Sequence, residues 1–336
     1  MALLTRAAFG LLGVFAASGC ANLLVEDHGA EANVRDFQAA WETIGRVYPY
    51  LSFKGIDWQG LYPEYRARAE KARGDEIYPI LFDLLAELRD VHAGLTTLGG
   101  YYMPTYESPR ALRDRRAFDP EVVRRYATSE FRMGGGRRFE YGLVGGNFGY
   151  LRLSTFAEGD WVREVDGALE SLCETTRLIL DVRHNDGGAG GNACYLVRGF
   201  LSEPLAPPPM YRQGEEVAQE PLRPRRVPWK FSSIAVLING VSCSAAELFA
   251  EMMKQLPHVT LVGDTTAGGS GSPEYFRLPS GIKIRVPTTD LRRYDGLPFE
   301  WLGVSPDVRV PQTEADVRSG RDLQLESALA VLQGGT

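Results

Sequence analysis

The sequence predicts an α/β fold in which a helical N-terminal part precedes a layered core of helices and strands. Two patterns indicate this. Apolar and aromatic residues recur at helical spacing through residues 37–48 and 77–88. From residue 148 onward, short apolar runs typical of buried strands alternate with amphipathic runs typical of helices. With 336 residues, 44% of them apolar, the chain can bury a full core.

Five regions are expected along the chain. Residues 1–19 are expected to form a signal peptide, 20–33 a tether, 34–100 a helical subdomain, 101–147 an irregular region of loops and short strands, and 148–333 the α/β core. Within the core, the pattern predicts strands at 150–153, 178–182, 234–238 and 259–262, and helices at 161–173, 195–201 and 244–256. Residues 282–286 alternate between apolar and basic, which is typical of a half-exposed strand.

The first twenty residues are typical of an export signal, with a short basic start, a short apolar run and small residues. The apolar run from Ala7 to Ala17 is too short to span a bilayer, which takes roughly 20 residues. The stretch Ala17–Cys20 resembles a bacterial lipobox, in which Cys20 would be lipidated and become the new N-terminus. Cleavage after Ser18, with Cys20 unmodified, is the alternative.

The lipobox resemblance also implies a location. Ala21 follows Cys20, where an Asp would retain a bacterial lipoprotein in the inner membrane. We therefore expect a lipid anchor on the periplasmic face of an outer membrane.

Charge and cysteine content exclude several classes of protein. The formal net charge of −6 and the absence of a basic run argue against a nucleic-acid partner. After Cys20 only three cysteines remain (Cys173, Cys194 and Cys243), at spacings that fit neither a disulfide framework nor a zinc site. No phosphate loop or His-Glu-x-x-His helix is present, so we expect no metal and no cofactor.

Ser244 is the candidate nucleophile. It lies between a predicted buried strand and a predicted helix, at the carboxyl end of the strand, where α/β sheets place ligands. A serine here could attack a carbonyl while the N–H of Ala245 faces the oxyanion. Serine is also among the commonest helix N-caps, and the position alone favours that role over the nucleophile.

A serine nucleophile usually needs a histidine as its base. Of the four histidines, His28 lies in the tether and His258 in a turn, so His92 and His184 are the candidates. His184 precedes a glycine-rich turn, Gly187-Gly188, whose backbone N–H groups could supply a second oxyanion donor. The residues alone favour neither histidine.

Two carboxylates could orient the base. Asp90 lies two residues before His92, and Glu300 lies in a segment rich in glycine and proline. Most carboxylates are only solvated, so each signal is weak alone. The Gly-x-Ser-x-Gly elbow of α/β-hydrolases is absent.

Taken together, these segments resemble the tail-specific or carboxyl-terminal processing proteases, which form peptidase family S41. Within this family they resemble the branch that includes the tricorn core protease and the retinoid-binding proteins, here without a PDZ domain. The matching stretches occur in family order: Leu88–His92, Gly149–Leu153, Leu180–Gly188, Ser244–Glu247, Gly263–Gly268, Leu278–Gly281 and Glu300–Asp307. The resemblance implies a crotonase- or ClpP-like core of β-β-α units and makes residues 148–333 a serine peptidase core. A PDZ domain needs about 90 residues, and only roughly fifty separate His92 from Gly149.

The resemblance also implies roles for individual residues. Ser244 matches the nucleophile, Ala245 one oxyanion donor, and Gly187 or Gly188 the other. His92 falls on the histidine of the family's Asp-x-His motif, and Glu300 on the glutamate that completes the site in tricorn-like members.

Three positions depart from the family pattern. Gly269 stands where the processing proteases carry a lysine base, which excludes their Ser-Lys mechanism unless another lysine substitutes. Val91 replaces a serine before the histidine, so Asp90 remains an alternative to Glu300. Ala245 replaces the aspartate that selects basic residues in the tricorn protease.

The function that the resemblance implies is that of an exported serine peptidase acting on polypeptides through a Ser-His acyl-enzyme mechanism. The alternative is a non-catalytic module that holds an apolar ligand on the same fold, as retinoid-binding relatives do.

Overall fold

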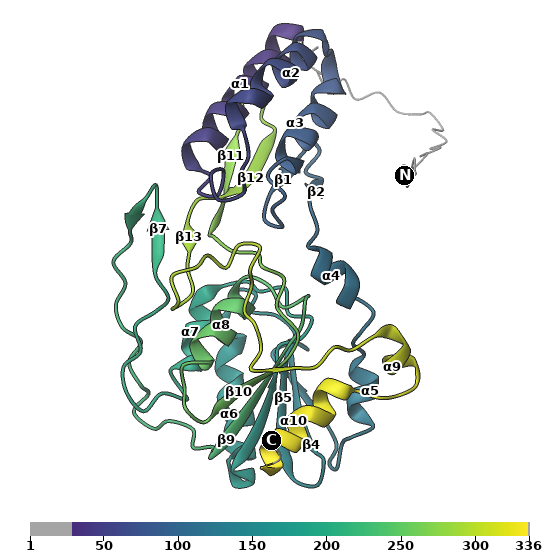
Figure 1. Ribbon diagram of the computed structural model, residues 1–336, viewed down its shortest axis with the longest axis vertical. Helices are drawn as coiled ribbons and strands as arrows, with labels where there is room; N and C mark the ends of the chain where they lie inside the picture. The colour runs from purple at the N-terminus through teal and green to yellow at the C-terminus, as the bar shows by residue number, and fades with distance from the viewer. Residues whose placement is uncertain (1–28, 335–336) are drawn as a thin grey trace.

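The computed structural model describes residues 29–334 (Figure 1). The expected signal peptide, Cys20 and most of the expected tether lie outside the described residues. Within residues 29–334, no helix combines the length and apolar character that a membrane span requires.

An N-terminal lobe forms the upper part of the molecule in Figure 1. It contains α1 (Ala30–Val47), α2 (Trp58–Lys71), η1 (Gly74–Glu76) and α3 (Ile77–Ala86). These helices pack on an antiparallel sheet ordered β11 (Pro273–Arg277), β12 (Lys283–Pro287), β1 (Gly94–Thr96), β2 (Tyr102–Pro104). The expected tether is wrong for residues 30–33, because α1 already begins at Ala30.

The helical subdomain expected over residues 34–100 is present as α1, α2 and α3, but strands also belong to the lobe. Strand β1 pairs with β12, so a hairpin from the expected core crosses into the lobe. The physical reason is burial: Ile282, Ile284 and Val286 form an apolar face that the helices cover, while the alternating basic side chains remain outside the core.

The core is built on a seven-stranded sheet ordered β14-β10-β9-β6-β5-β4-β3. Its strands are β3 (Arg132–Gly134), β4 (Phe139–Val144), β5 (Phe148–Leu153), β6 (Arg177–Asp181), β9 (Ser233–Ile238), β10 (Val259–Gly263) and β14 (Val308–Arg309). The five strands from β14 to β5 are parallel, and β4 and β3 are antiparallel to their neighbours. Because β3 and β4 belong to this sheet, the core starts before residue 148.

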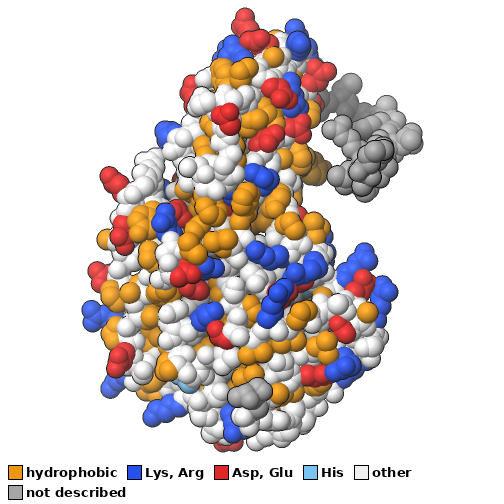
Figure 2. All heavy atoms as spheres, viewed as in Figure 1, with side chains coloured by type: hydrophobic (Ala, Val, Ile, Leu, Met, Phe, Trp, Pro, Cys, Tyr) orange, Lys and Arg blue, Asp and Glu red, His pale blue; other side chains and the backbone are white. Residues whose placement is uncertain are grey.

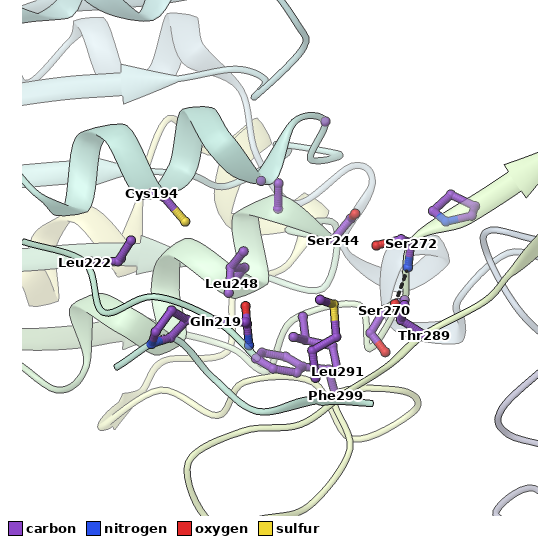
Figure 3. A pocket seen from close by; sticks show the side chains of 18 of the residues that line it. Cys194, Gln219, Leu222, Ser244, Leu248, Ser270, Ser272, Thr289, Leu291 and Phe299 are labelled. Carbon is purple, nitrogen blue, oxygen red and sulfur yellow. Dashed lines mark hydrogen bonds between the residues drawn. The ribbon is translucent and has the colours of Figure 1, made fainter. Parts of the chain in front are cut away.

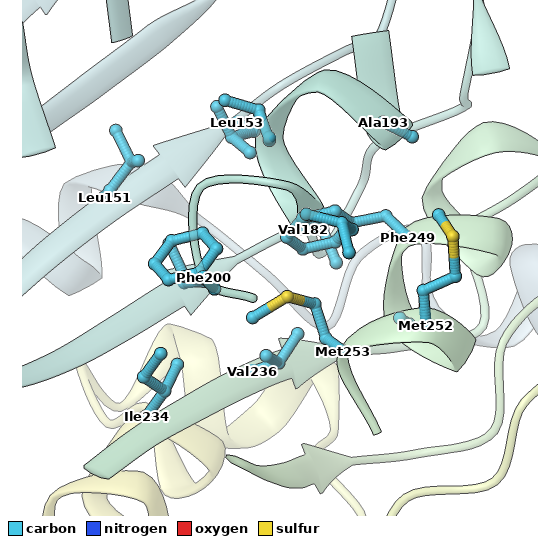
Figure 4. Packing of buried hydrophobic residues seen from close by; sticks show 14 of the residues in the cluster. Leu151, Leu153, Val182, Ala193, Phe200, Ile234, Val236, Phe249, Met252 and Met253 are labelled. Atoms are coloured by element: carbon cyan, nitrogen blue, oxygen red, sulfur yellow. The ribbon is translucent and has the colours of Figure 1, made fainter. Parts of the chain in front are cut away.

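Helices cover both faces of the sheet. On one face lie η2 (Asp160–Glu164), α6 (Val165–Leu172), η3 (Cys173–Thr175), α7 (Gly190–Val197) and α8 (Ala245–Met253), which contact the side chains of Leu151, Val182, Ile234 and Val236 (Figure 4). On the other face, α10 (Leu323–Gln333) packs on Ile179, Ala235 and Leu237. Burial on both faces explains why these strands are continuous apolar runs.

Short elements connect the two parts. α4 (Pro109–Asp114) and α5 (Pro120–Arg124) lead from the lobe into the core, and α9 (Glu314–Arg318) precedes α10. A small sheet ordered β13 (Asp290–Leu291), β7 (Met210–Arg212), β8 (Glu215–Glu216) lies beside the core. Hydrophobic side chains gather on the viewed face where lobe and core meet (Figure 2).

A buried ionic network ties α10 to the sheet. Arg183, fully buried, donates to Asp181 at 2.6 Å and to Asp322 at 2.8 Å. Tyr150 donates its hydroxyl to the same Asp181 carboxylate at 2.7 Å. These bonds hold the pKa of Asp181 below its ordinary value despite the opposing effect of burial.

Substitution Arg183→Lys is expected to lower the free energy of unfolding by about 1–3 kcal/mol, because one ammonium group cannot replace the planar guanidinium between two carboxylates. Urea unfolding would measure the change. Arg132→Lys, at an exposed position of β3, is the matched control. Equal stability of the two variants would contradict a structural role for the network.

Candidate active site

Ser244 occupies a strained turn between β9 and α8. Its backbone has φ 57° and ψ −119°, a left-handed φ that non-glycine residues seldom adopt. Ser244 and Glu247 have the spacing of a capping box, and the backbone N–H of Ser244 donates to Glu247 Oε2 at 2.9 Å. A left-handed backbone at a non-glycine residue clusters at functional sites, so a capping role alone does not account for Ser244.

Glu247 holds the turn and was missed by sequence reasoning. Its buried carboxylate accepts the backbone N–H groups of Ser244, Gly268 and Gly269 at 2.8–2.9 Å, and the hydroxyl of Thr266. Burial raises the pKa of Glu247 to about 7, and these four donors oppose that rise. The Ser-x-x-Glu spacing at the start of a helix could have indicated this role of Glu247 in the sequence.

Two backbone N–H groups are candidate oxyanion donors, because Ala245 follows Ser244 in the chain and Gly188 lines the same cavities as Ser244. Those of Ala245 and Gly188 have no hydrogen-bond acceptor among the described residues, whereas the N–H of Gly187 donates to Asn185 Oδ1 at 2.9 Å. Of the glycine pair, Gly188 is therefore the candidate second oxyanion donor. Gly187, with φ 92°, must lack a side chain, because a Cβ there would lie 2.7 Å from Ser244 Cβ and 2.8 Å from the nitrogen of Ala245.

His92 and Ser244 line the same cavity, which we call the catalytic cleft; it has a volume of about 530 Å³ and also contains Gly187 and Gly188. His92 lies in the turn before β1, with Nδ1 3.1 Å from the carbonyl oxygen of Ser270. A carbonyl only accepts, so Nδ1 carries the proton and Nε2 has a free lone pair. Burial lowers the pKa of His92 below 6.5, and the charge of Arg285 lowers it further.

Neither candidate carboxylate makes a hydrogen bond to the imidazole ring. Asp90 instead accepts the backbone N–H of His92 at 2.8 Å, and Glu300 accepts the backbone N–H of Ser270 at 3.1 Å. The expected contact between a carboxylate and the imidazole of His92 is therefore wrong, because the backbone carbonyl of Ser270 contacts Nδ1 instead. Any residue type has such a carbonyl, so the sequence held no signal for Ser270.

Behind these carboxylates lies Lys54, which sequence reasoning also missed. Its ammonium contacts Glu300 Oε1 at 2.6 Å and Asp90 Oδ2 at 3.6 Å, and it donates to the carbonyl of Leu88 at 2.8 Å. The side chains of Lys54 and Asp90 are fully buried, and that of Glu300 is 1% exposed. Burial raises the pKa of Glu300, as does the negative charge of Asp90, while Lys54 opposes both effects. One cation thus neutralises part of a buried carboxylate pair.

His184, the other histidine that the sequence left open, lies outside the catalytic cleft. Its Nε2 is 3.1 Å from the carbonyl oxygen of Asp114, and its ring packs on Phe118 with a centroid separation of 5.0 Å. These contacts fix the connection between α4 and the sheet. Within residues 29–334, no cluster of His, Cys, Asp and Glu side chains could hold a metal ion.

Comparison with known protein families finds two matches. Residues 147–310 match the model of peptidase family S41, and residues 31–88 match that of the tricorn protease C1 domain. The first match contains Ser244 and Glu300, and the second contains Lys54.

Individual relatives agree with these matches. The chain is 31% identical over 196 residues to a carboxyl-terminal-processing protease of Synechocystis, covering 57% of this chain and 45% of that protein. It is 30% identical over 198 residues to tricorn protease homolog 1 of Streptomyces coelicolor, and this match covers 58% of this chain and 18% of that protein. The chain therefore spans less than half the length of these curated relatives.

A solved structure matches over a larger share of both chains. A candidate peptidase from Parabacteroides merdae is 27% identical, with a TM-score of 0.77, covering 89% of this chain and 96% of that one. The similarity thus includes both the lobe and the core.

Proposed function

Because this chain belongs to peptidase family S41, we propose that it is an exported serine peptidase that hydrolyses peptide bonds through an acyl-enzyme. One observation carries the proposal. Ser244 lies in a strained turn in the cleft that also contains His92 and Gly188, and the backbone N–H groups of Ala245 and Gly188 have no acceptor among residues 29–334.

In the first half of the reaction, Ser244 Oγ attacks the substrate carbonyl and His92 Nε2 takes the hydroxyl proton. The carbonyl oxygen becomes an oxyanion, which the N–H groups of Ala245 and Gly188 stabilise. The protonated His92 then gives its proton to the leaving amine, and the acyl group remains on Ser244. The carbonyl of Ser270 keeps the imidazole in the tautomer that this sequence of transfers needs.

In the second half, water replaces the amine. His92 takes a proton from the water as it attacks the acyl-enzyme, and the same two N–H groups stabilise the second oxyanion. His92 returns the proton to Ser244 Oγ, which releases the carboxylic acid and restores the enzyme. Asp90 and Glu300 act as positioning residues through backbone N–H groups rather than on the ring.

The remaining expectations from the sequence belong to the same proposal. The consecutive parallel strands with intervening helices are consistent with a crotonase- or ClpP-like core, although only β4, β5 and α6 form a β-β-α unit within the main sheet. Anchoring through Cys20 on the periplasmic face of an outer membrane rests on the Ala17–Cys20 pattern. In vivo labelling with a fatty-acid analogue that persisted in Cys20→Ala would contradict the anchor.

Labelling by a fluorophosphonate and hydrolysis of an unfolded reporter protein test the activity together. Both are expected in the parent protein and absent in Ser244→Ala and His92→Ala. Activity that survived in Ser244→Ala would contradict the assignment of the nucleophile. If the parent is unlabelled and carries a co-purifying lipid, the alternative of an apolar-ligand binder is favoured.

The pH dependence of kcat/KM is expected to report His92. The imidazole must be neutral to act as a base, and its pKa is lowered, so the acid limb should have its midpoint below pH 6.5. Arg285→Gln removes a nearby positive charge and should move the limb to higher pH. His184→Gln is the control, and a limb that moves in this variant but not in Arg285→Gln would contradict the choice of base.

A further inference from the structure

A second cavity meets the catalytic cleft at Ser244 and Gly188, and we call it the apolar pocket. We propose that it receives the side chain of the residue whose carbonyl Ser244 attacks, and that it selects a large apolar side chain. This rests on the proposed function and adds the substrate class. The pocket also has a volume of about 530 Å³, which is enough to enclose a leucine or phenylalanine side chain.

The walls of the pocket come from four parts of the core. Figure 3 shows Ser244 at one end and Cys194 and Leu222 at the opposite end, with Leu248 between them and Leu291 and Phe299 along one side. α7 contributes Cys194, and α8 contributes Leu248 one turn after the nucleophile. The segment around Leu222 closes the far end, where its backbone pairs with Leu205. Apolar side chains therefore form most of the lining, and its polar part consists of Gln219, Glu220, Ser270, Ser272 and Thr289 beside Ser244.

The position of His92 decides which part of the substrate enters. His92 must protonate the leaving amine, so the leaving half of the substrate lies on the side of the ring. His92 lines the catalytic cleft and does not line the apolar pocket. The acyl half, whose carbonyl carbon bonds to Ser244, therefore lies on the side of the pocket.

The charges in the pocket define the class of side chain. None of the described residues that line it is Lys, Arg or His, and its single carboxylate, Glu220, is exposed. A buried acidic side chain would lose its hydration and meet no cation, and a basic one would meet only the exposed Glu220. Apolar side chains incur no such loss and gain from leaving water.

Peptides that differ only in the residue before an aminocoumarin leaving group test the proposal. We expect kcat/KM for Leu and Phe to exceed that for Ala on the order of ten- to two-hundredfold, with Arg and Asp below Ala. A preference for Arg or Asp over Leu, in protein that fluorophosphonate still labels, would overturn the pocket assignment alone. Absence of both labelling and hydrolysis would instead overturn the proposed function on which it rests.

A matched pair of variants places the selectivity in this cavity. Leu222→Asp adds a carboxylate at the far end, and the Arg-to-Leu ratio of kcat/KM is expected to rise at least tenfold. Leu222→Asn removes the same apolar surface without a charge, so it should weaken the preference for Leu without favouring Arg. Identical profiles for the two variants would overturn the placement of the side chain.

Cys194 supplies a readout that does not depend on turnover. A peptidyl phosphonate bearing Leu, once bonded to Ser244, should fill the pocket and slow alkylation of Cys194 by iodoacetamide at least tenfold relative to a phosphonate bearing Gly. Cys173, which lies outside the pocket, is the internal control, and mass spectrometry of tryptic peptides distinguishes the two thiols. Equal alkylation of Cys194 under both phosphonates would overturn the proposal.

Discussion

Substitution Gly269→Ala is expected to reduce kcat/KM on the order of a hundredfold, because it displaces the base from the nucleophile. A Cβ at this position would lie 2.3 Å from Val91 Cγ2, 2.7 Å from Cys243 Sγ and 3.7 Å from His92 Cε1. Val91 directly precedes His92, so a shift of Val91 moves the ring. The carbonyl of Gly269 also accepts the N–H of Ser244 at 3.2 Å, so the nucleophile moves as well.

A compensating substitution makes this prediction specific. Val91→Ala removes the atom closest to the new Cβ, so the double variant Gly269→Ala/Val91→Ala should recover part of the lost kcat/KM. Gly191→Ala is the control, because a Cβ there meets nothing within 4 Å. Full activity in Gly269→Ala, or equal losses in both glycine variants, would contradict the steric argument. The same crowding explains why a lysine at position 269 would not fit beside His92.

Much of the fold could be predicted because it depends on local pattern. The strands that flank Ser244, at residues 234–238 and 259–262, are continuous apolar runs, and burial on both faces of a parallel sheet leaves that signature. α8 was expected from the residues that follow Ser244, and it begins one residue later, at Ala245. Helix α7 begins at Gly190, five residues before the expected start, because its first turn is glycine-rich and lacks helical periodicity.

The rest of the site could not be predicted because it depends on contacts between distant segments. Lys54 and Glu300 are 246 positions apart in sequence, and nothing in the local pattern around Lys54 indicates that its ammonium is buried. The hairpin of β11 and β12 joins β1 across the chain for a similar reason. The choice of Gly188 over Gly187 depends on which N–H is already bonded, and only the folded backbone defines that.

Substitution Lys54→Met is expected to lower the free energy of unfolding by about 3–5 kcal/mol, because it leaves Asp90 and Glu300 buried without their cation. Burial and Asp90 already raise the pKa of Glu300, and removing Lys54 should raise it further. A carboxyl whose folded pKa is raised loses its stabilising contribution as pH increases through that pKa. The difference in the free energy of unfolding between Lys54→Met and the parent protein should therefore be larger at pH 8 than at pH 5, as measured by urea unfolding. The exposed Lys71 supplies the control, Lys71→Met.

Activity distinguishes a positioning role for Lys54 from a purely structural one. Lys54 holds Glu300, Glu300 holds the N–H of Ser270, and the carbonyl of Ser270 holds Nδ1 of His92, so loss of the cation should lower kcat more than it changes KM. The double variant Lys54→Met/Glu300→Gln removes the buried negative charge on Glu300 and should regain stability without regaining kcat. If stability and kcat recover together, Lys54 only balances charge; if stability alone recovers, the N-terminal lobe positions the base through this one side chain.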